Sequence, residues 1–290
     1  MKLLVLGGDG MLGHQLMYSL SKDHEVKCTL RGSEEQYGGA SIFRDSNAFF
    51  DTDIRDEVRI IETLGAFEPY AVINCVGIVK QRMESKESIP SIEINALAPH
   101  KIAGICKGRG IRFIHVSTDC VFDGKTGGYK ESDPCNVSDI YGLTKYLGET
   151  QGPNSLTLRT SIIGHELRRK TGLLEWFLAQ TEPVKGFKNA IFSGLTTFEL
   201  ANVINMLITQ YRDVYGLYHV SSQPITKFDL LHLFNEVYER NISIEVDEEF
   251  FCNRSLDSSQ FRTTCNYAPP EWDALIRSMK EDYDERCKEN

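Results

Sequence analysis

The sequence has no long apolar run and no concentrated stretch of positive charge. Nothing approaches the roughly 18 consecutive apolar residues that a membrane-spanning helix needs, so no membrane partner is expected. The formal net charge is −9, and the longest basic run is Arg168-Arg169-Lys170. Because binding to nucleic acid needs a concentrated basic surface, no nucleic-acid partner is expected either.

Clustered cysteines are also lacking. The eight cysteines are irregularly spaced and no two form a C-x-x-C pair, which argues against a paired-cysteine zinc site and a disulfide framework. The chain opens on the strand-like Lys2–Leu6 instead of a basic segment followed by an apolar stretch, so no signal peptide is expected. We therefore expect no metal site, reduced thiols and a cytoplasmic location.

Strand and helix patterns alternate through the first half of the chain. Strands are expected at Lys2–Leu6, Glu25–Leu30, Ala71–Cys75, Arg112–Val116 and Leu156–Arg159, and helices at Met11–Ser21, Asp56–Leu64 and Ser91–Arg109. Val58, Ile61 and Leu64 recur in three-residue steps and are expected to share one face of their helix, while Gly110 is expected to end the long helix. The alternation predicts an α/β fold with a Rossmann-type, doubly wound parallel sheet.

The alternation weakens in the second half. We expect a Rossmann domain over residues 1–164, to which residues 195–221 return, and a smaller C-terminal lobe over residues 165–290.

A glycine-rich turn, Gly7-Gly-Asp-Gly10-Met11-Leu12-Gly13, separates the first strand from the first helix. Such a turn lets a pyrophosphate approach the backbone, and the N-terminus of the following helix offers N–H groups and the positive end of the helix dipole. The turn is therefore expected to seat a dinucleotide, although a tight turn without a ligand has the same spacing.

Two later positions bear on which dinucleotide is bound. Arg31 follows the second strand, where an acidic residue would favour NAD. A guanidinium suits a 2′-phosphate, so NADPH is favoured and NADH stays possible; the alternative is a solvated surface arginine. Asp53, with Ile54, either caps the next helix or hydrogen-bonds the adenine amino group, and both roles can hold together.

Tyr141 and Lys145 stand four residues apart on a predicted helix, which places them on one face. A neighbouring ammonium lowers the pKa of a phenol, so the tyrosine can exchange a proton near neutral pH. Thr118, with Ser117 beside it, ends a predicted strand and is expected to hydrogen-bond the substrate oxygen. These residues predict hydride transfer between a nicotinamide and a carbonyl carbon, with Tyr141 as the proton donor. Alone, the Tyr–Lys spacing also fits a solvated helix pair.

The glycine turn, Ser117-Thr-Asp-Cys-Val-Phe-Asp-Gly124 and Tyr141-x-x-x-Lys145 together resemble the extended short-chain dehydrogenase/reductases. More narrowly, they resemble the dTDP-4-dehydrorhamnose reductase branch, which reduces nucleotide-linked 4-keto-6-deoxy sugars to the 4-hydroxy sugars for surface polysaccharide or deoxysugar biosynthesis. The resemblance implies a C-terminal lobe that mainly binds substrate. The oligomeric state stays open, with a homodimer as one possibility because helices that flank such sheets often pair in dimers. The resemblance implies catalysis by Thr118, Tyr141 and Lys145. It also implies cofactor contacts from the glycine turn, Asp53, Ile54, Cys75, Val76 and Gly77, and substrate contacts from Ser117, Thr118, Asn95 and Arg254. Tyr141 and Lys145 are expected to contact the cofactor as well, since the lysine can hold the nicotinamide ribose.

Two of these predicted substrate contacts need further comment. Asn95 has the alternative of a buried polar side chain that satisfies backbone groups. The family's Arg-Pro substrate motif appears here only as Arg254 in Arg254-Ser-Leu-Asp-Ser258. This departure bears on which sugar is used.

Other activities on the same scaffold make different demands. Sugar-nucleotide dehydratases place an Asp-Glu pair after the catalytic threonine; here the pair is Asp119-Cys120, so dehydration is not expected. A bifunctional epimerase/reductase needs a Cys/His pair, for which Cys120 and His165 are candidates. A regulatory subunit that binds NADP without catalysis is a further alternative. The nucleotide and the hexose stay open.

Overall fold

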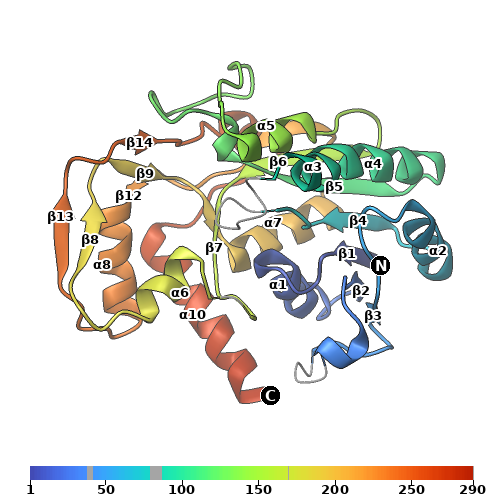
Figure 1. Ribbon diagram of the computed structural model, residues 1–290, viewed down its shortest axis with the longest axis horizontal. Coiled ribbons are helices and arrows are strands. Elements are labelled where there is room, and N and C mark those ends of the chain that lie inside the picture. Colours follow the sequence, from blue (N-terminus) through green and yellow to red (C-terminus); the bar gives the residue numbers. More distant parts are fainter. Residues whose placement is uncertain (38–41, 79–86, 169, 290) are drawn as a thin grey trace. The chain divides into compact units, whose positions relative to one another are not determined.

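A seven-stranded sheet is the central element of the fold (Figure 1). The computed structural model describes residues 1–37, 42–78, 87–168 and 170–289. The strand order is β11-β6-β5-β4-β1-β2-β3, and the pairs β2–β3, β1–β2, β1–β4 and β4–β5 are parallel. The strands are β1 (Lys2–Leu6), β2 (Glu25–Thr29), β3 (Ala48–Phe49), β4 (Ala71–Asn74), β5 (Arg112–Thr118), β6 (Ser155–Thr160) and β11 (Gly216–His219). The predicted α/β fold is confirmed.

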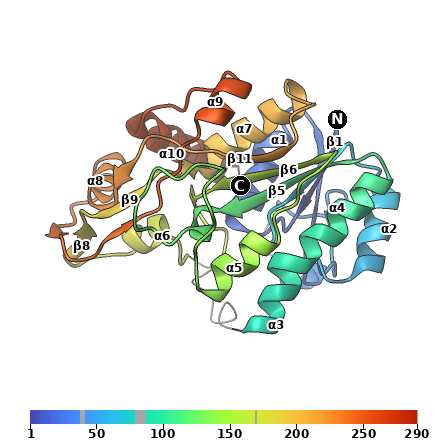
Figure 2. The same cartoon turned by 90° about the horizontal axis from the view of Figure 1, so that it is seen from above.

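Helices cover both faces of this sheet (Figures 1 and 2). One face carries α1 (Met11–Leu20) and α7 (Thr197–Thr209), and the other carries α2 (Glu57–Phe67), α4 (Ala98–Gly108) and α5 (Ile140–Leu147). Shorter turns are η1 (Glu34–Tyr37) and α3 (Ser88–Ser91). β4 is buried along its whole length, as expected of an interior parallel strand. Leu4, Val72 and Phe113 of the strands form one core cluster with Leu64 of α2 and Ile102 of α4.

The chain divides into two compact units, each made of several segments. The first contains Met1–Thr118, Ser138–Leu158 and Ala201–Leu217, and the second contains Asp119–Val137, Arg159–Leu200 and Tyr218–Asn290. That cofactor binds to the first and substrate mainly to the second stays a prediction.

The second unit consists of short strands and helices around its own core. Its small sheets are β7 (Ile162–Ile163) with β10 (Leu195–Thr196), β9 (Ala190–Phe192) with β12 (Ile225–Thr226) and β14 (Cys252–Asn253), and β8 (Val184–Phe187) with β13 (Ile244–Asp247). Its helical segments are η4 (Asp119–Val121), α6 (Leu173–Leu178), α8 (Lys227–Val237), α9 (Ser259–Thr264) and α10 (Trp272–Glu289). Phe177, Phe234 and Ile276 bring α6, α8 and α10 together in the core. Within the described ranges, no helix is long and apolar enough to cross a membrane.

Helix α2 buries a different face from the one predicted. The side chain of Asp56 caps its N-terminus by accepting from the backbone N–H of Arg59. Val58 is 66% exposed, and the buried side chains include Ile60, Leu64 and Phe67. The prediction that Val58 and Ile61 join Leu64 on the buried face was wrong. Three-residue steps fall short of the 3.6-residue turn and drift off one face, whereas steps of four and three stay on it.

The long helix predicted over Ser91–Arg109 is interrupted by a wider turn. After α3, the segment η3 (Ile92–Leu97) is π-helical, and α4 then begins with Pro99 in its first turn. Gly110 follows α4 with φ +68°, in the left-handed region that favours glycine, which agrees with the predicted stop. The π segment contains Asn95, and π-helical turns occur frequently at functional sites.

A buried arginine joins β5 to α7 within the first unit. Arg112 is 4% exposed and donates to the carbonyls of Leu207 at 2.6 Å, Val214 at 2.8 Å and Tyr211 at 3.2 Å. The last carbonyls of a helix lack partners within it, so this guanidinium caps the end of α7 and its following turn.

Candidate active site

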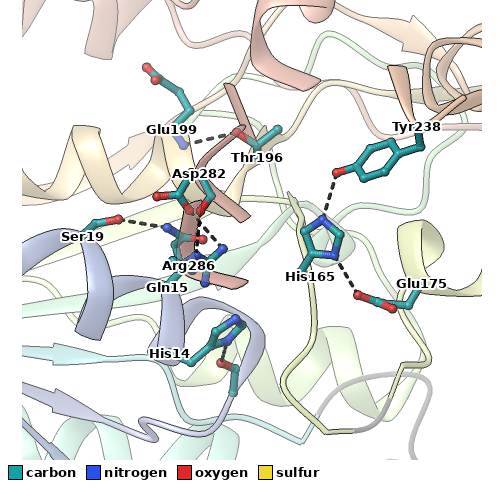
Figure 3. Close-up of polar contacts among 11 residues, drawn as sticks. His14, Gln15, Ser19, His165, Glu175, Thr196, Glu199, Tyr238, Asp282 and Arg286 are labelled. Atoms are coloured by element: carbon teal, nitrogen blue, oxygen red, sulfur yellow. Dashed lines mark hydrogen bonds and ion pairs between the residues drawn. The ribbon is translucent and has the colours of Figure 1, made fainter. Parts of the chain in front are cut away.

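The glycine turn between β1 and α1 leaves no room for a side chain at Gly7 or Gly13. Gly7 has φ +81°, and a Cβ there would lie 2.8 Å from Cγ2 of Val76. A Cβ on Gly13 would overlap the Gly7 carbonyl. Gly10 is the N-cap of α1, and Nδ1 of His14 lies 2.9 Å from its carbonyl oxygen (Figure 3). This close-packed turn at a helix N-terminus fits a pyrophosphate bound through backbone N–H groups. The predicted contacts from Gly7, Gly10, Met11, Leu12 and Gly13 therefore suit their positions, Leu12 through its backbone because its side chain is buried.

Arg31 and Asp53 come close together after β2 and β3. Asp53 accepts from Nη2 of Arg55 at 2.8 Å and from its Nε at 3.0 Å. This hydrogen bonding, aided by the charges of Arg55 and Arg31, holds the pKa of Asp53 below its usual range. Because Asp56 caps α2, the alternative that Asp53 caps it was wrong. Ile54 packs its side chain into the core, so a cofactor contact there would use its backbone.

The loop Cys75–Gly77 follows β4 and lies next to both the glycine turn and Lys145 of α5. Val76 faces Gly7, as described above. A Cβ on Gly77 would lie 3.4 Å from Oδ1 of Asn95 and 4.0 Å from Nζ of Lys145. The predicted cofactor-binding loop and the predicted catalytic lysine are therefore neighbours.

Lys145 lies against the end of β5, the strand that delivers Thr118. It is 5% exposed, and its Nζ donates to the carbonyl oxygen of Val116 at 2.8 Å. Thr118 is buried, and Tyr141 stands one turn before Lys145 on α5. All three residues of the predicted triad belong to the first unit. Their catalytic roles stay predictions.

Glu149 belongs to this group and was missed by the sequence reasoning. The hydroxyl of Ser117 donates to Oε1 of Glu149 at 2.8 Å. Burial lowers the pKa of Lys145 to about 8, and the negative charge of Glu149 is the larger of two opposing influences. No local signal points to Glu149, because α5 ends at Leu147 and Ser117 lies 32 residues earlier in the chain.

Asn95 uses its side chain to hold backbone groups. Its Oδ1 accepts from the N–H of Ile78 at 2.9 Å, and its Nδ2 donates to the Ile78 carbonyl at 3.1 Å and to Oγ1 of Thr144 at 3.3 Å. It is 1% exposed. A Cβ on Gly148 would overlap the Asn95 carbonyl, so α5 ends in close contact with η3. This favours the structural alternative for Asn95, and a substrate contact stays a prediction.

Arg254 is held within the second unit. Its Nε donates to the carbonyl of Phe122 at 2.8 Å. Gly124 has φ +81°, and a Cβ there would lie 2.9 Å from Sγ of Cys252 and 3.1 Å from Cγ of Arg254. The motif segment that ends at Gly124 and the strand β14 segment are thus packed together. A role for Arg254 in substrate binding stays a prediction.

His165 of the second unit lies between Glu175 and Tyr238 (Figure 3). Its Nδ1 lies 2.9 Å from Oε1 of Glu175 and its Nε2 lies 2.9 Å from the hydroxyl of Tyr238. The ring stacks on Tyr283 with centroids 3.6 Å apart. With both nitrogens engaged and 3% exposure, His165 is poorly suited to act with Cys120 as an acid–base pair. Across the described residues, no group of three or more His, Cys, Asp or Glu side chains is arranged to hold a metal ion.

Comparisons with known proteins bear on the family and the fold of the chain. A family model described as the RmlD substrate binding domain matches residues 1–284. The chain is 30% identical over 237 residues to the "probable low-salt glycan biosynthesis reductase Agl14" of Haloferax volcanii, which spans 77% of this chain and 75% of that protein. It is 25% identical over 173 residues to methionine adenosyltransferase 2 subunit beta of Danio rerio, covering 58% of this chain and 50% of that one. The crystal structure of dTDP-4-dehydrorhamnose reductase from Bacillus anthracis in complex with NADP has a TM-score of 0.80 at 20% identity, covering 97% of this chain and 98% of that one.

Proposed function

Because the chain belongs to the family described as the RmlD substrate binding domain, we propose that it reduces the 4-keto group of a nucleotide-linked 4-keto-6-deoxy sugar with NADPH. The resemblance seen in the motifs is confirmed by the match over residues 1–284. A relative at 30% identity is named a glycan biosynthesis reductase, which supports a place in surface polysaccharide or deoxysugar biosynthesis.

The observation that carries the proposal is the position of Lys145. Its buried ammonium stands beside Gly77 of the cofactor loop and on the end of β5, one helical turn from Tyr141. NADPH, when bound along the glycine turn and this loop, would supply the hydride. Tyr141 would give a proton to the carbonyl oxygen, and Lys145 would favour its ionised form afterwards. Thr118 would hydrogen-bond the same oxygen and fix its position.

Arg31 supports NADPH over NADH. It is exposed at the end of β2, and its charge reaches Asp53. A guanidinium there suits a 2′-phosphate, and the Bacillus anthracis structure of the same fold was solved with NADP. NADH use is the secondary possibility.

The experiment that tests the proposal is a panel of 4-keto-6-deoxy sugars linked to dTDP, UDP and GDP, each incubated with NADPH or NADH. Oxidation of NADPH that depends on one added sugar supports it, and NMR of the product gives the stereochemistry at C4. The reaction run in D₂O separates the epimerase/reductase alternative, because epimerisation next to a ketone exchanges a carbon-bound proton with solvent. No turnover of any sugar in the panel would contradict the reductase assignment.

A regulatory role is the second candidate, favoured by the similarity to methionine adenosyltransferase 2 subunit beta. That similarity covers about half of each chain. Tight NADPH binding measured by calorimetry, together with no turnover across the panel, would support this candidate. Retention of Tyr141, Lys145 and Thr118 favours the enzyme, because cofactor binding alone does not require a proton donor.

We also propose a homodimer in the cytoplasm. Apolar side chains are exposed on segments that pack together in the first unit, α3, η3 and α5: Ile89, Ile92, Leu97, Leu143, Tyr146 and Leu147. Exposed apolar side chains of this kind mark protein interfaces. Light scattering after size-exclusion chromatography should give the mass of two chains, and Leu147→Glu should give one; a wild-type mass of 32.9 kDa would contradict the dimer.

A further inference from the structure

Two adjacent residues at the end of β5 hold two opposite charges. The Val116 carbonyl accepts from Nζ of Lys145, and the Ser117 hydroxyl donates to Glu149. Val116 uses its backbone and Ser117 its side chain, so the strand positions both charges at once. Ser117 is 4% exposed, and its hydrogen bond to the half-buried Glu149 is partly shielded from solvent.

Among the described residues, the negative charge of Glu149 is the larger of the two influences that keep Lys145 charged. Cys75 also opposes the loss of charge from Lys145, but burial raises the pKa of its thiol to about 12, so it is neutral. Burial and the charge of Lys145 push the pKa of His115 well below its usual range, which leaves this imidazole uncharged. On α5 itself, Tyr141 stands one helical turn before Lys145.

We propose that Glu149 is a positioning residue that keeps the buried Lys145 ammonium charged, with Ser117 anchoring its carboxylate. This proposal rests on the proposed function only for the catalytic role of the Lys145 ammonium, because the contacts of these three side chains do not depend on a substrate. Ser117 therefore acts chiefly through Glu149. Without the carboxylate, the buried ammonium would lose its proton at a lower pH.

Titration of Lys145 in the full chain without cofactor or sugar tests the proposal directly. The protein is labelled with ¹³C-lysine, and the Lys145 signal is assigned by its loss in Lys145→Met. We expect a midpoint near pH 8 in the wild type. In Glu149→Gln, which keeps an oxygen for Ser117, the midpoint should fall by about one pH unit, the lower end for loss of a nearby opposite charge.

Glu62→Gln is the matched control, because it removes an exposed carboxylate on α2 that pairs with Arg59. Its Lys145 midpoint should equal that of the wild type. Ser117→Ala keeps the charge of Glu149 but removes its anchor, and a smaller fall is expected; this variant decides the matter if Glu149→Gln does not fold. A wild-type midpoint in Glu149→Gln, or in Ser117→Ala when it stands alone, overturns the proposal.

The pH profile of turnover gives the second readout. In Glu149→Gln, kcat/KM should fall about tenfold relative to wild type at pH 8.5 and stay near wild type at pH 6.5, since one pKa unit is tenfold in protonation. An equal loss at both pH values would assign Glu149 a structural role and contradict the proposal. If no sugar is ever reduced, the proposed function fails while the lysine titration still decides the role of Glu149.

Discussion

The carboxamide of Asn95 pairs with both backbone polar groups of Ile78, accepting its N–H at 2.9 Å and donating to its carbonyl at 3.1 Å. A single side chain in the π-helical segment thus substitutes for a strand neighbour where the loop leaves β4. Asn95→Ala would leave two buried backbone groups without these partners. We expect the free energy of unfolding to fall by about 2–6 kcal/mol, since each buried unsatisfied group costs about 1–3 kcal/mol.

Urea unfolding followed by circular dichroism measures this loss. Thr144→Val, which removes only the 3.3 Å contact to Asn95 and the hydroxyl's own backbone bonds, should cost less. Equal stability of Asn95→Ala and the wild type would show that Ile78 finds other partners.

Tyr141→Phe removes the proposed proton donor with little change in shape. We expect kcat to fall about 10²–10⁴-fold, the usual contribution of a positioned proton donor. Tyr146→Phe is the control, because Tyr146 is 44% exposed on the same helix. Steady-state NADPH oxidation measures both variants. Full turnover by Tyr141→Phe would remove Tyr141 from the reaction.

Arg31→Ala should weaken NADPH binding and spare NADH. Loss of a charge-assisted bond to a phosphate is expected to raise the Kd for NADPH by about tenfold to a hundredfold, from a bond worth about 1.5–3 kcal/mol. Isothermal calorimetry with both cofactors measures the ratio. Arg59→Ala, at an exposed position of α2, should leave the Kd values for NADPH and NADH unchanged. Equal weakening for NADPH and NADH would refute 2′-phosphate recognition by Arg31.

Buried thiols should make the protein lose stability in alkali. Burial raises the pKa of Cys28, Cys75 and Cys106 from 9.0 to about 12. Between these values the unfolded chain has released thiol protons that the folded chain keeps, so stability falls as the pH rises. Each such thiol contributes about 1.4 kcal/mol per pH unit.

Cys106→Ala tests this linkage away from the candidate site. Its unfolding free energy between pH 9.5 and 10.5 should fall less steeply than that of the wild type, by about 1.4 kcal/mol per unit. Val58→Ala, at an exposed position of α2 that carries no titratable group, should keep the wild-type slope. A Cys106→Ala slope equal to that of the wild type would mean that this thiol ionises in the folded protein.

The order of strands and helices along the first half of the chain could be predicted because apolar runs and glycine turns are local signals. The buried face of α2 could not be predicted from Val58, Ile61 and Leu64, since a three-residue spacing fits more than one stripe on a helix. Neither could the π segment around Asn95. An extra residue in a turn leaves the apolar pattern nearly intact and is stabilised by contacts with Ile78 and Thr144, which are distant in sequence.

The candidate site shows the same contrast between local signals and contacts distant in sequence. Tyr141 and Lys145 are recognisable from spacing on one helix. Glu149 is not, because its importance depends on Ser117, which lies 32 residues earlier and meets it only in the folded chain.

The bonds from Arg112 to Leu207, Tyr211 and Val214 have a consequence for synthesis of the chain. A nascent polypeptide emerging from the ribosome has made β1 through β6 long before these acceptors exist. Its first unit is therefore incomplete until the segment ending at Leu217 has left the exit tunnel, by which time the second unit's middle segment, Arg159–Leu200, has been translated in full. A gene truncated after the catalytic helix would encode every residue of the proposed triad and still lack the carbonyls that hold this guanidinium.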